Sequence, residues 1–168
     1  SYLDRDNAVA IDPLGLKLGN KTYETNLLKG IFGSLRDASP DYWGRRVIQK
    51  RSGRTEHGEI DYLLHSPDDR AGALGFGLNK EPPAPRRKFN RTIELEKLQK
   101  LADAIIADED IPDNADAEQA EDLMFGGTSM GGARPKALVE DENTLWIAKF
   151  NRLDDSWNVA RVEHAMLK

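Results

Sequence analysis

The spacing of apolar residues along this chain predicts one long amphipathic helix, over residues 93–107. Apolar side chains recur there at intervals of three to four positions, and Glu and Lys side chains occupy the opposite face. The apolar stripe consists of Leu95, Leu98, Ala102, Ile105 and Ile106. Thr92 precedes the stretch and is a suitable N-cap, because its hydroxyl can accept a hydrogen bond from a free backbone N–H of the first turn. We expect this helix to pack its apolar face against a core.

Two shorter helices are predicted upstream, over residues 42–50 and 59–65. The first has a clear start, since the Ser39 hydroxyl can accept from a free N–H, Pro40 presets φ, and Asp41 suits the positive end of the helix dipole. Its apolar stripe would contain Trp43, Val47 and Ile48. Arginine, lysine and glutamine fill its other face, so this helix should also be half-buried.

Short strands are predicted on both sides of the long helix. Residues 72–77 (GALGFG) predict a brief strand of small residues, and the proline-rich basic segment 81–88 predicts an extended loop after it. Near the C-terminal end, strands over 137–139 and 145–150 should form a hairpin around a turn over 140–143. Together with the helices, these strands predict an α+β fold.

The remaining segments are polar or acidic. Residues 1–29 show no helical period and contain turn-forming Gly, Asn and Pro positions, which is typical of the interior of a domain. The acidic segment 108–118 should separate the long helix from a short helix that ends near Phe125, and we expect a subdomain boundary within it. A second acidic turn, residues 152–156, leads into a helix predicted to begin near Asn158.

Composition limits the classes of function. The 168 residues include no cysteine, and the three histidines lack the spacing of metal ligands, so we expect no structural metal. No run of about 18 apolar residues is present, which predicts a cytoplasmic protein without a membrane span. A net charge of −5 disfavours a broad nucleic-acid surface. The basic run 86–88 is most simply a solvated loop.

The most informative segment is glycine-rich and covers residues 126–132. Its four glycines flank Thr128, Ser129 and Met130. A backbone with so few Cβ atoms can wrap an anion with its N–H groups pointing inward. The segment does not match the phosphate loop in which Lys directly follows the last glycine, because Ala133 follows Gly132. A plain turn remains the alternative interpretation.

Lys149 is the second candidate, because it lies in the otherwise apolar returning strand of the hairpin. Burying an ammonium there is costly unless it meets an anion, and Glu163 on the following helix could supply a carboxylate. Glycine loop, strand, lysine strand and glutamate helix follow one another in this order in protein kinases. Lys149 could equally reach water from an edge strand, and Glu163 could lie on a solvated helix face. Three tryptophans are predicted to be core or interface anchors: Trp43, Trp146 and Trp157.

Four segments in this order resemble the HipA family of bacterial serine/threonine kinase toxins: LRDASPDYWGRRVI, DDRAGALGFG, GGTSMGGARPKA and LWIAKF. The resemblance covers most of the chain. It implies a small sheet with helices as an N-terminal subdomain over residues 1–107, an acidic linker over 108–116, and the first part of a kinase's smaller lobe over 117–168. It also implies ATP and Mg²⁺ as cosubstrates, and an activity that phosphorylates proteins such as aminoacyl-tRNA synthetases.

Carried over by position, the resemblance assigns roles to single residues. The loop that closes on ATP falls on Met130, Gly131, Gly132, Ala133, Arg134 and Lys136. The lysine that contacts the ATP phosphates falls on Lys149, for which Glu163 remains the possible partner that the order of elements suggests. Ser129 matches the family's autophosphorylated serine, and Thr128 is an adjacent second candidate. A phosphate at this position would repel the nucleotide, so modification should inactivate the kinase.

The family's catalytic Asp and Asn and its further metal-binding Asp have no match in these residues. We therefore expect no catalytic residue and no metal ligand in this chain, and expect it to be an inactive part of a longer kinase. The resemblance implies a helix-turn-helix antitoxin as partner, with DNA contacted only indirectly and no contact with a membrane. Two alternatives remain: a stand-alone, non-catalytic interaction subunit of a split system, and a degenerate nucleotide-binding or scaffold domain of unrelated ancestry.

Overall fold

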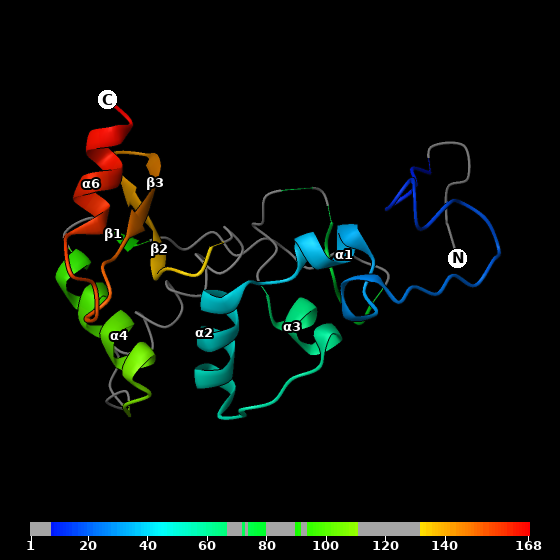
Figure 1. The fold of residues 1–168 in the computed structure, drawn as a ribbon, viewed down its shortest axis with the longest axis horizontal. Helices are drawn as coiled ribbons and strands as arrows, with labels where there is room; N and C mark the ends of the chain where they lie inside the picture. Colours follow the sequence, from blue (N-terminus) through cyan, green and yellow to red (C-terminus); the bar gives the residue numbers. More distant parts are fainter. Residues whose placement is uncertain (1–7, 67–71, 73, 80–89, 92–93, 111–131) are drawn as a thin grey trace. The chain divides into compact units, whose positions relative to one another are not determined.

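The chain folds into two compact units, residues 1–39 and residues 40–168. In this computed structural model the described residues are 8–66, 72, 74–79, 90–91, 94–110 and 132–168. Helices and a small sheet occur together, which confirms the predicted α+β class (Figure 1). No helix in these described ranges is both long enough and apolar enough to cross a membrane.

The first unit contains two short helical segments, η1 (Leu27–Lys29) and α1 (Gly33–Ala38). Asp12 organises the residues before them, because its carboxylate accepts hydrogen bonds from the backbone N–H groups of Leu14 and Gly15 at 3.1 and 2.8 Å. The bond from Gly15 is the largest cause that lowers the pKa of this carboxyl. Helix α1 was absent from the sequence expectations, since its six residues carry too little periodicity to reveal it.

Ser39 closes α1 and does not open the next helix, which corrects the sequence expectation. Its backbone is extended, with φ −77° and ψ 144°, and its N–H bonds to the Arg36 carbonyl. Pro40 favours this extended conformation, which a helix N-cap would also have, so the difference lies one step further on: Asp41 is extended as well, with φ −80° and ψ −164°. Asp41 is therefore the N-cap of α2 (Tyr42–Ser52), although its side chain makes no capping hydrogen bond.

In the described part of the second unit there are four helices and three strands. After α2 come α3 (Glu59–His65), β1 (Asn90–Arg91), α4 (Leu95–Ala107), β2 (Lys136–Asp141), β3 (Thr144–Lys149) and α6 (Val159–Met166). Arg45 ties α3 to α2, because its guanidinium bonds both Glu59 carboxylate oxygens at 2.8 and 2.6 Å and lies 4.4 Å from the centre of the Tyr62 ring.

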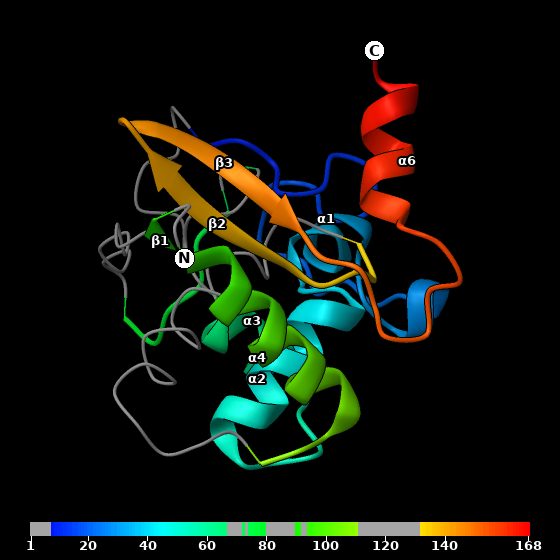
Figure 2. The same cartoon turned by 90° about the vertical axis from the view of Figure 1, so that its left-hand side faces the viewer.

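The three strands form one sheet in the order β1-β2-β3 (Figure 2). Strands β2 and β3 are antiparallel, as predicted, and their register places Lys136 opposite Lys149. The two-residue turn between them, Glu142 and Asn143, has positive φ at both positions (45° and 67°), which suits the right-handed twist of a tight hairpin. The predicted turn over 140–143 was too long, because β2 continues to Asp141.

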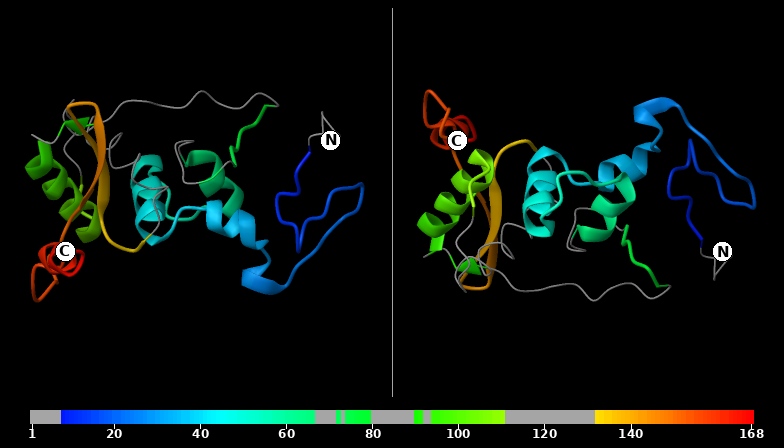
Figure 3. Two further views of the ribbon diagram at one scale, coloured as in Figure 1. Left: turned by 90° about the horizontal axis from the view of Figure 1, so that it is seen from above. Right: turned by 90° about the horizontal axis from the view of Figure 1, so that it is seen from below.

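The core lies between α2, α4 and one face of the hairpin, and α3 contributes Tyr62 to it. Figure 3 shows α4 alongside the hairpin from above and from below. The buried cluster contains Trp43, Val47, Ile48, Tyr62, Leu98, Leu101, Ala102, Ile105, Ala137, Val139 and Phe150. Most of the predicted α4 stripe is confirmed. Leu95 is the exception, since it lies in the first turn and remains 38% exposed, and Leu101 is buried in addition.

Two other expectations are wrong or only partly right. Residues 74–77 form no strand, so the expected strand over 72–77 is not present in the part of it that the structure describes. Trp43 is 1% exposed and is a core anchor as predicted, whereas Trp146 and Trp157 are 55% and 65% exposed and lie outside the core, so for them the predicted role as interface anchors stays a prediction. The expected Thr92 cap, the loop over 81–88 and the helix ending near Phe125 lie outside the described residues.

Replacement of Trp43 by Ala tests the position of the core. The ring is fully buried and its Nε1–H donates to the Lys136 carbonyl at 3.1 Å, so the change removes packing and leaves a buried carbonyl without this donor. We expect a loss of about 3–5 kcal/mol in unfolding free energy. Trp157→Ala is the matched control and should stay within about 0.5 kcal/mol. Urea unfolding monitored by circular dichroism measures both, and equal losses would contradict the packing described.

Candidate functional site

The candidate site lies at the open end of the β2–β3 hairpin, where the glycine-rich segment enters β2. Three cationic side chains occur there: Arg134 just before β2, Lys136 at its first position, and Lys149 at the last position of β3. Lys136 and Lys149 face each other directly across the two strands. Like charges in opposed positions repel, so the arrangement requires nearby acceptors or carboxylates.

Lys149 pairs with Glu163 of α6. The ammonium donates to the Glu163 carboxylate, and the two side chains are 46% and 40% exposed. Helix α6 is positioned for this contact at its start, where Asn158 accepts from the Arg161 N–H at 3.0 Å and Asn151 accepts from the Ala160 N–H at 3.2 Å. The lysine is therefore not buried as the apolar strand suggested, because β3 is an edge strand whose side chains are largely exposed.

Arg134 is held by Asp155 in the turn between β3 and α6. Its guanidinium donates to both carboxylate oxygens, at 2.6 and 2.9 Å, and the Arg152 N–H donates to the same carboxylate at 2.9 Å. The bonds from Arg134 are the largest cause that lowers the pKa of Asp155 to about 2. The contact fixes the residues before β2 to the residues after β3.

Lys136 is buried, with 4% of its surface exposed. Its ammonium donates to the Gly132 carbonyl at 2.9 Å. Burial lowers the pKa of this lysine, the opposite charge of Asp41 works against that shift, and the like charge of Lys149 adds to it. Of the two opposed lysines, one is therefore enclosed by the protein and the other faces solvent.

Gly132 has a conformation that favours glycine, with φ +103°. A Cβ on this residue would lie 3.0 Å from the Lys136 ammonium and 3.9 Å from an Asp41 carboxylate oxygen. Both charged groups therefore converge on the last residue of the glycine-rich segment. Any side chain at this position would displace the lysine.

The structure brings some of the sequence-predicted residues together. Arg134, Lys136, Lys149 and Glu163 lie around the open end of the hairpin, and Ala133 is exposed beside them. Thr128, Ser129, Met130 and Gly131 lie outside the described residues, so their roles stay predictions. Asp41 and Asp155 were missed as site residues, because their partners are distant in sequence. The sequence indicated Asp41 only as a favourable charge at a helix start and Asp155 only as part of an acidic turn.

The surroundings set what each cation can do chemically. Glu163 influences both Lys149 and Arg134, since its charge also raises the pKa of Arg134, for which the Asp155 hydrogen bonds are the larger cause. Lys149 keeps nearly half of its side-chain surface in water, so an incoming anion can reach its ammonium. The ammonium has three N–H donors, so it can bond that anion while it stays paired with Glu163.

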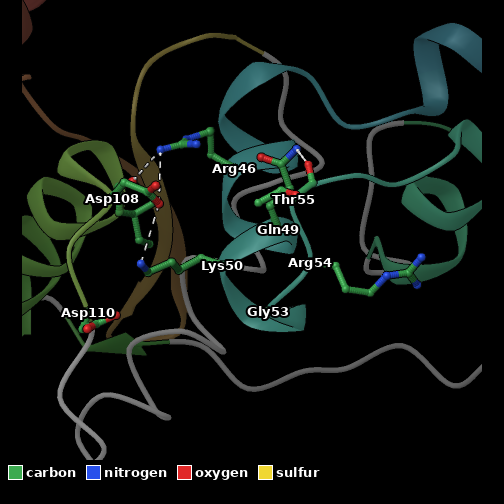
Figure 4. Close-up of a pocket in the computed structure, with 9 residues that line it drawn as sticks. Arg46, Gln49, Lys50, Gly53, Arg54, Thr55, Asp108 and Asp110 are labelled. Carbon is green, nitrogen blue, oxygen red and sulfur yellow. Dashed lines mark hydrogen bonds and ion pairs between the residues drawn. The ribbon is translucent and has the colours of Figure 1, made fainter.

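A separate pocket of about 570 Å³ lies between the C-terminal ends of α2 and α4. Figure 4 shows Arg46 and Lys50 pointing toward Asp108, while Arg54 points away from it. Both cations lie 3.7 Å from the same Asp108 oxygen. These two ion pairs link α2 to the C-terminal end of α4. In the described ranges, no group of three or more His, Cys, Asp or Glu side chains could hold a metal ion.

None of the protein-family models matches this chain, and no curated protein and no solved structure shows significant similarity to it.

The Arg134–Asp155 contact predicts a pH effect with a defined sign. The pKa of Asp155 is depressed to about 2 from 3.8, so the contact stabilises the fold above about pH 3.8 and is lost as pH falls toward 2. Arg134→Gln should raise the Asp155 pKa toward 3.8, as followed by carboxyl ¹³C NMR. Arg152→Gln is the matched control and should change it less, because its charge is a minor cause. An Asp155 pKa that ignores Arg134→Gln would contradict the assignment.

Proposed function

We propose that this chain carries the ATP-phosphate site of a HipA-like serine/threonine protein kinase of a toxin–antitoxin system. The observation that carries the proposal is the ion pair between Lys149 and Glu163, formed across β3 and α6 beside the entry of the glycine-rich segment. Kinases place a strand lysine and a helix glutamate in this relation, with the lysine contacting phosphates. The sequence resemblance supports the same assignment independently.

The chemistry of the described residues is suited to phosphate. Lys149 supplies an accessible ammonium, and Glu163 orients it from the neighbouring helix. Gly132 supplies a backbone free of Cβ atoms, which lets the main chain come close to an anion. ATP with Mg²⁺ is the proposed cosubstrate. Its phosphates would accept a further hydrogen bond from the Lys149 ammonium, which has three N–H donors, while Glu163 keeps the ammonium oriented.

The residues that would activate the acceptor hydroxyl and bind Mg²⁺ are proposed to lie elsewhere in the same gene product. Phosphoryl transfer requires an Asp near the acceptor hydroxyl and carboxylate or amide ligands for the metal. The sequence contains no segment with the family's spacing of these groups. In this proposal the chain binds and positions the nucleotide, and the protein substrate and a helix-turn-helix antitoxin are its partners.

A non-catalytic interaction subunit is the second candidate, and one observation favours it. Large apolar side chains on β3 and around α6 are exposed: Leu145, Trp146, Ile147, Leu153, Trp157, Val162, Met166 and Leu167. Apolar surface of this kind marks contact sites between proteins or between parts of one protein. The two candidates differ in whether the complete gene product transfers phosphate.

Lys149→Ala tests the phosphate site in the complete gene product. Removing an electrostatic contact to the transferring phosphate should reduce autophosphorylation by about 100-fold or more. Lys100→Ala is the matched control, since this exposed lysine lies on α4, and the control should retain full activity. Incorporation of ³²P from labelled ATP measures both variants. Undiminished transfer by Lys149→Ala would refute the site, and no transfer by the unaltered protein would favour the interaction subunit.

Ser129→Asp tests the proposed inactivation by phosphate. A fixed negative charge next to the ATP phosphates should repel the nucleotide and suppress both substrate phosphorylation and growth inhibition in cells. Ser129→Ala controls for loss of the hydroxyl and should stay toxic. A fully toxic Ser129→Asp variant would exclude the switch role of this serine.

A further inference from the structure

The described end of the glycine-rich segment is held by a lysine that has little access to solvent. Lys136 is 4% exposed, and its ammonium donates to the Gly132 carbonyl at 2.9 Å. A hydrogen bond with an ionised donor is roughly twice as strong as a neutral one. Gly132 has φ +103°, one of several conformations open to glycine, and the bond to its carbonyl holds the backbone in this one.

A second charged group lies at the same place. Both carboxylate oxygens of Asp41 are buried, and neither has a hydrogen-bond partner among the described residues. One of them lies 3.9 Å from the point where a Gly132 Cβ would be, and the Lys136 ammonium lies 3.0 Å from that point. A buried carboxylate without a donor is expensive unless an opposite charge compensates it. Lys136 supplies that charge.

We propose that Asp41 and Lys136 form a latch that holds the Gly132 end of the glycine-rich segment, and that Lys136 is a positioning residue and not a phosphate ligand. Asp41 keeps the buried ammonium charged, and the ammonium fixes the Gly132 carbonyl. The consequence for nucleotide binding rests on the proposed function, whereas the latch itself does not.

The contrast with Lys149 supports this division of roles. Lys149 is 46% exposed and can bond an incoming phosphate while it stays paired with Glu163. Lys136 would have to give up its bond to Gly132 and leave its buried position to reach a phosphate. The two lysines occupy opposed positions in the register. The Lys136 ammonium bonds the Gly132 carbonyl, and the Lys149 ammonium bonds Glu163.

The latch also connects α2 to the entry of β2. Asp41 is the N-cap of α2, and Trp43 in its first turn donates to the Lys136 carbonyl at 3.1 Å. Trp43 therefore fixes the backbone of Lys136, and the charge of Asp41 acts on its ammonium. A displacement of the start of α2 would release Gly132, which makes this helix end a route by which a bound partner could act on the segment.

Titration of Lys136 by NMR in the intact chain tests the latch without any nucleotide. Lysine labelled with ¹³C at Cε reports the charge of each ammonium, and glycine labelled at the carbonyl carbon reports the Gly132 acceptor. In the unaltered protein we expect the Lys136 pKa to lie below its ordinary value, and the Gly132 carbonyl signal to move with the same midpoint. Asp41→Asn should lower that midpoint, and Lys149→Met should raise it, following the directions in which these two charges act on Lys136.

Each outcome decides the proposal. A Gly132 carbonyl signal that does not follow the Lys136 titration would overturn the latch. This part of the test uses the unaltered protein, so it does not depend on the folding of any variant. A midpoint unchanged by Asp41→Asn, in a variant whose hairpin amide signals show an intact β2–β3 pairing, would remove Asp41 from it. Failure of the proposed kinase activity would leave this result intact, because the titration contains neither ATP nor a protein substrate.

Discussion

The pairing of two lysines across the β2–β3 hairpin is the constraint on which the candidate site depends. The register places Lys136 directly opposite Lys149, and such like-charged neighbours destabilise a sheet unless each finds its own compensation. The chain compensates them in different ways. Lys136 is enclosed with a backbone carbonyl and a nearby carboxylate, whereas Lys149 remains half in water with a glutamate from α6.

This separation follows from the position of the two strands. Strand β2 is central, since β1 and β3 both pair with it, and its first four residues are buried. Strand β3 is an edge strand and most of its residues are exposed. The same type of side chain is therefore buried on β2 and partly exposed on β3. A buried ammonium fixes the Gly132 carbonyl, and an exposed one is available to an incoming anion.

Local patterns explain how much of the fold the sequence could predict. The period of α4 and the acidic tight turn of the hairpin lie within short stretches, so both were predictable. Ser39 was misassigned because Ser39 and Asp41 are both residue types that favour the N-cap, and the local sequence does not distinguish them. The predicted strand of small residues near position 75 failed because small side chains offer little to pack against a sheet.

The candidate site was predictable only in part, because local patterns reveal some of its pairs and tertiary packing forms the others. Glu163 could be named as the partner of Lys149 because an ammonium in an apolar strand demands one, and the helix that follows carries few acids. Asp41 could not be assigned to Lys136 from the sequence. The two are brought together by tertiary packing, as is the neighbouring bond from Trp43 to the Lys136 carbonyl, whose partners are 93 positions apart.

The measurement that tests the account most directly uses an acyl-phosphate derivative of ATP, which acylates lysines next to bound phosphates, followed by mass spectrometry of the complete gene product. The account predicts acylation of Lys149 that free ATP suppresses, with Lys136 left unmodified. Acylation of Lys136, or acylation of Lys149 that free ATP leaves unchanged, would contradict it.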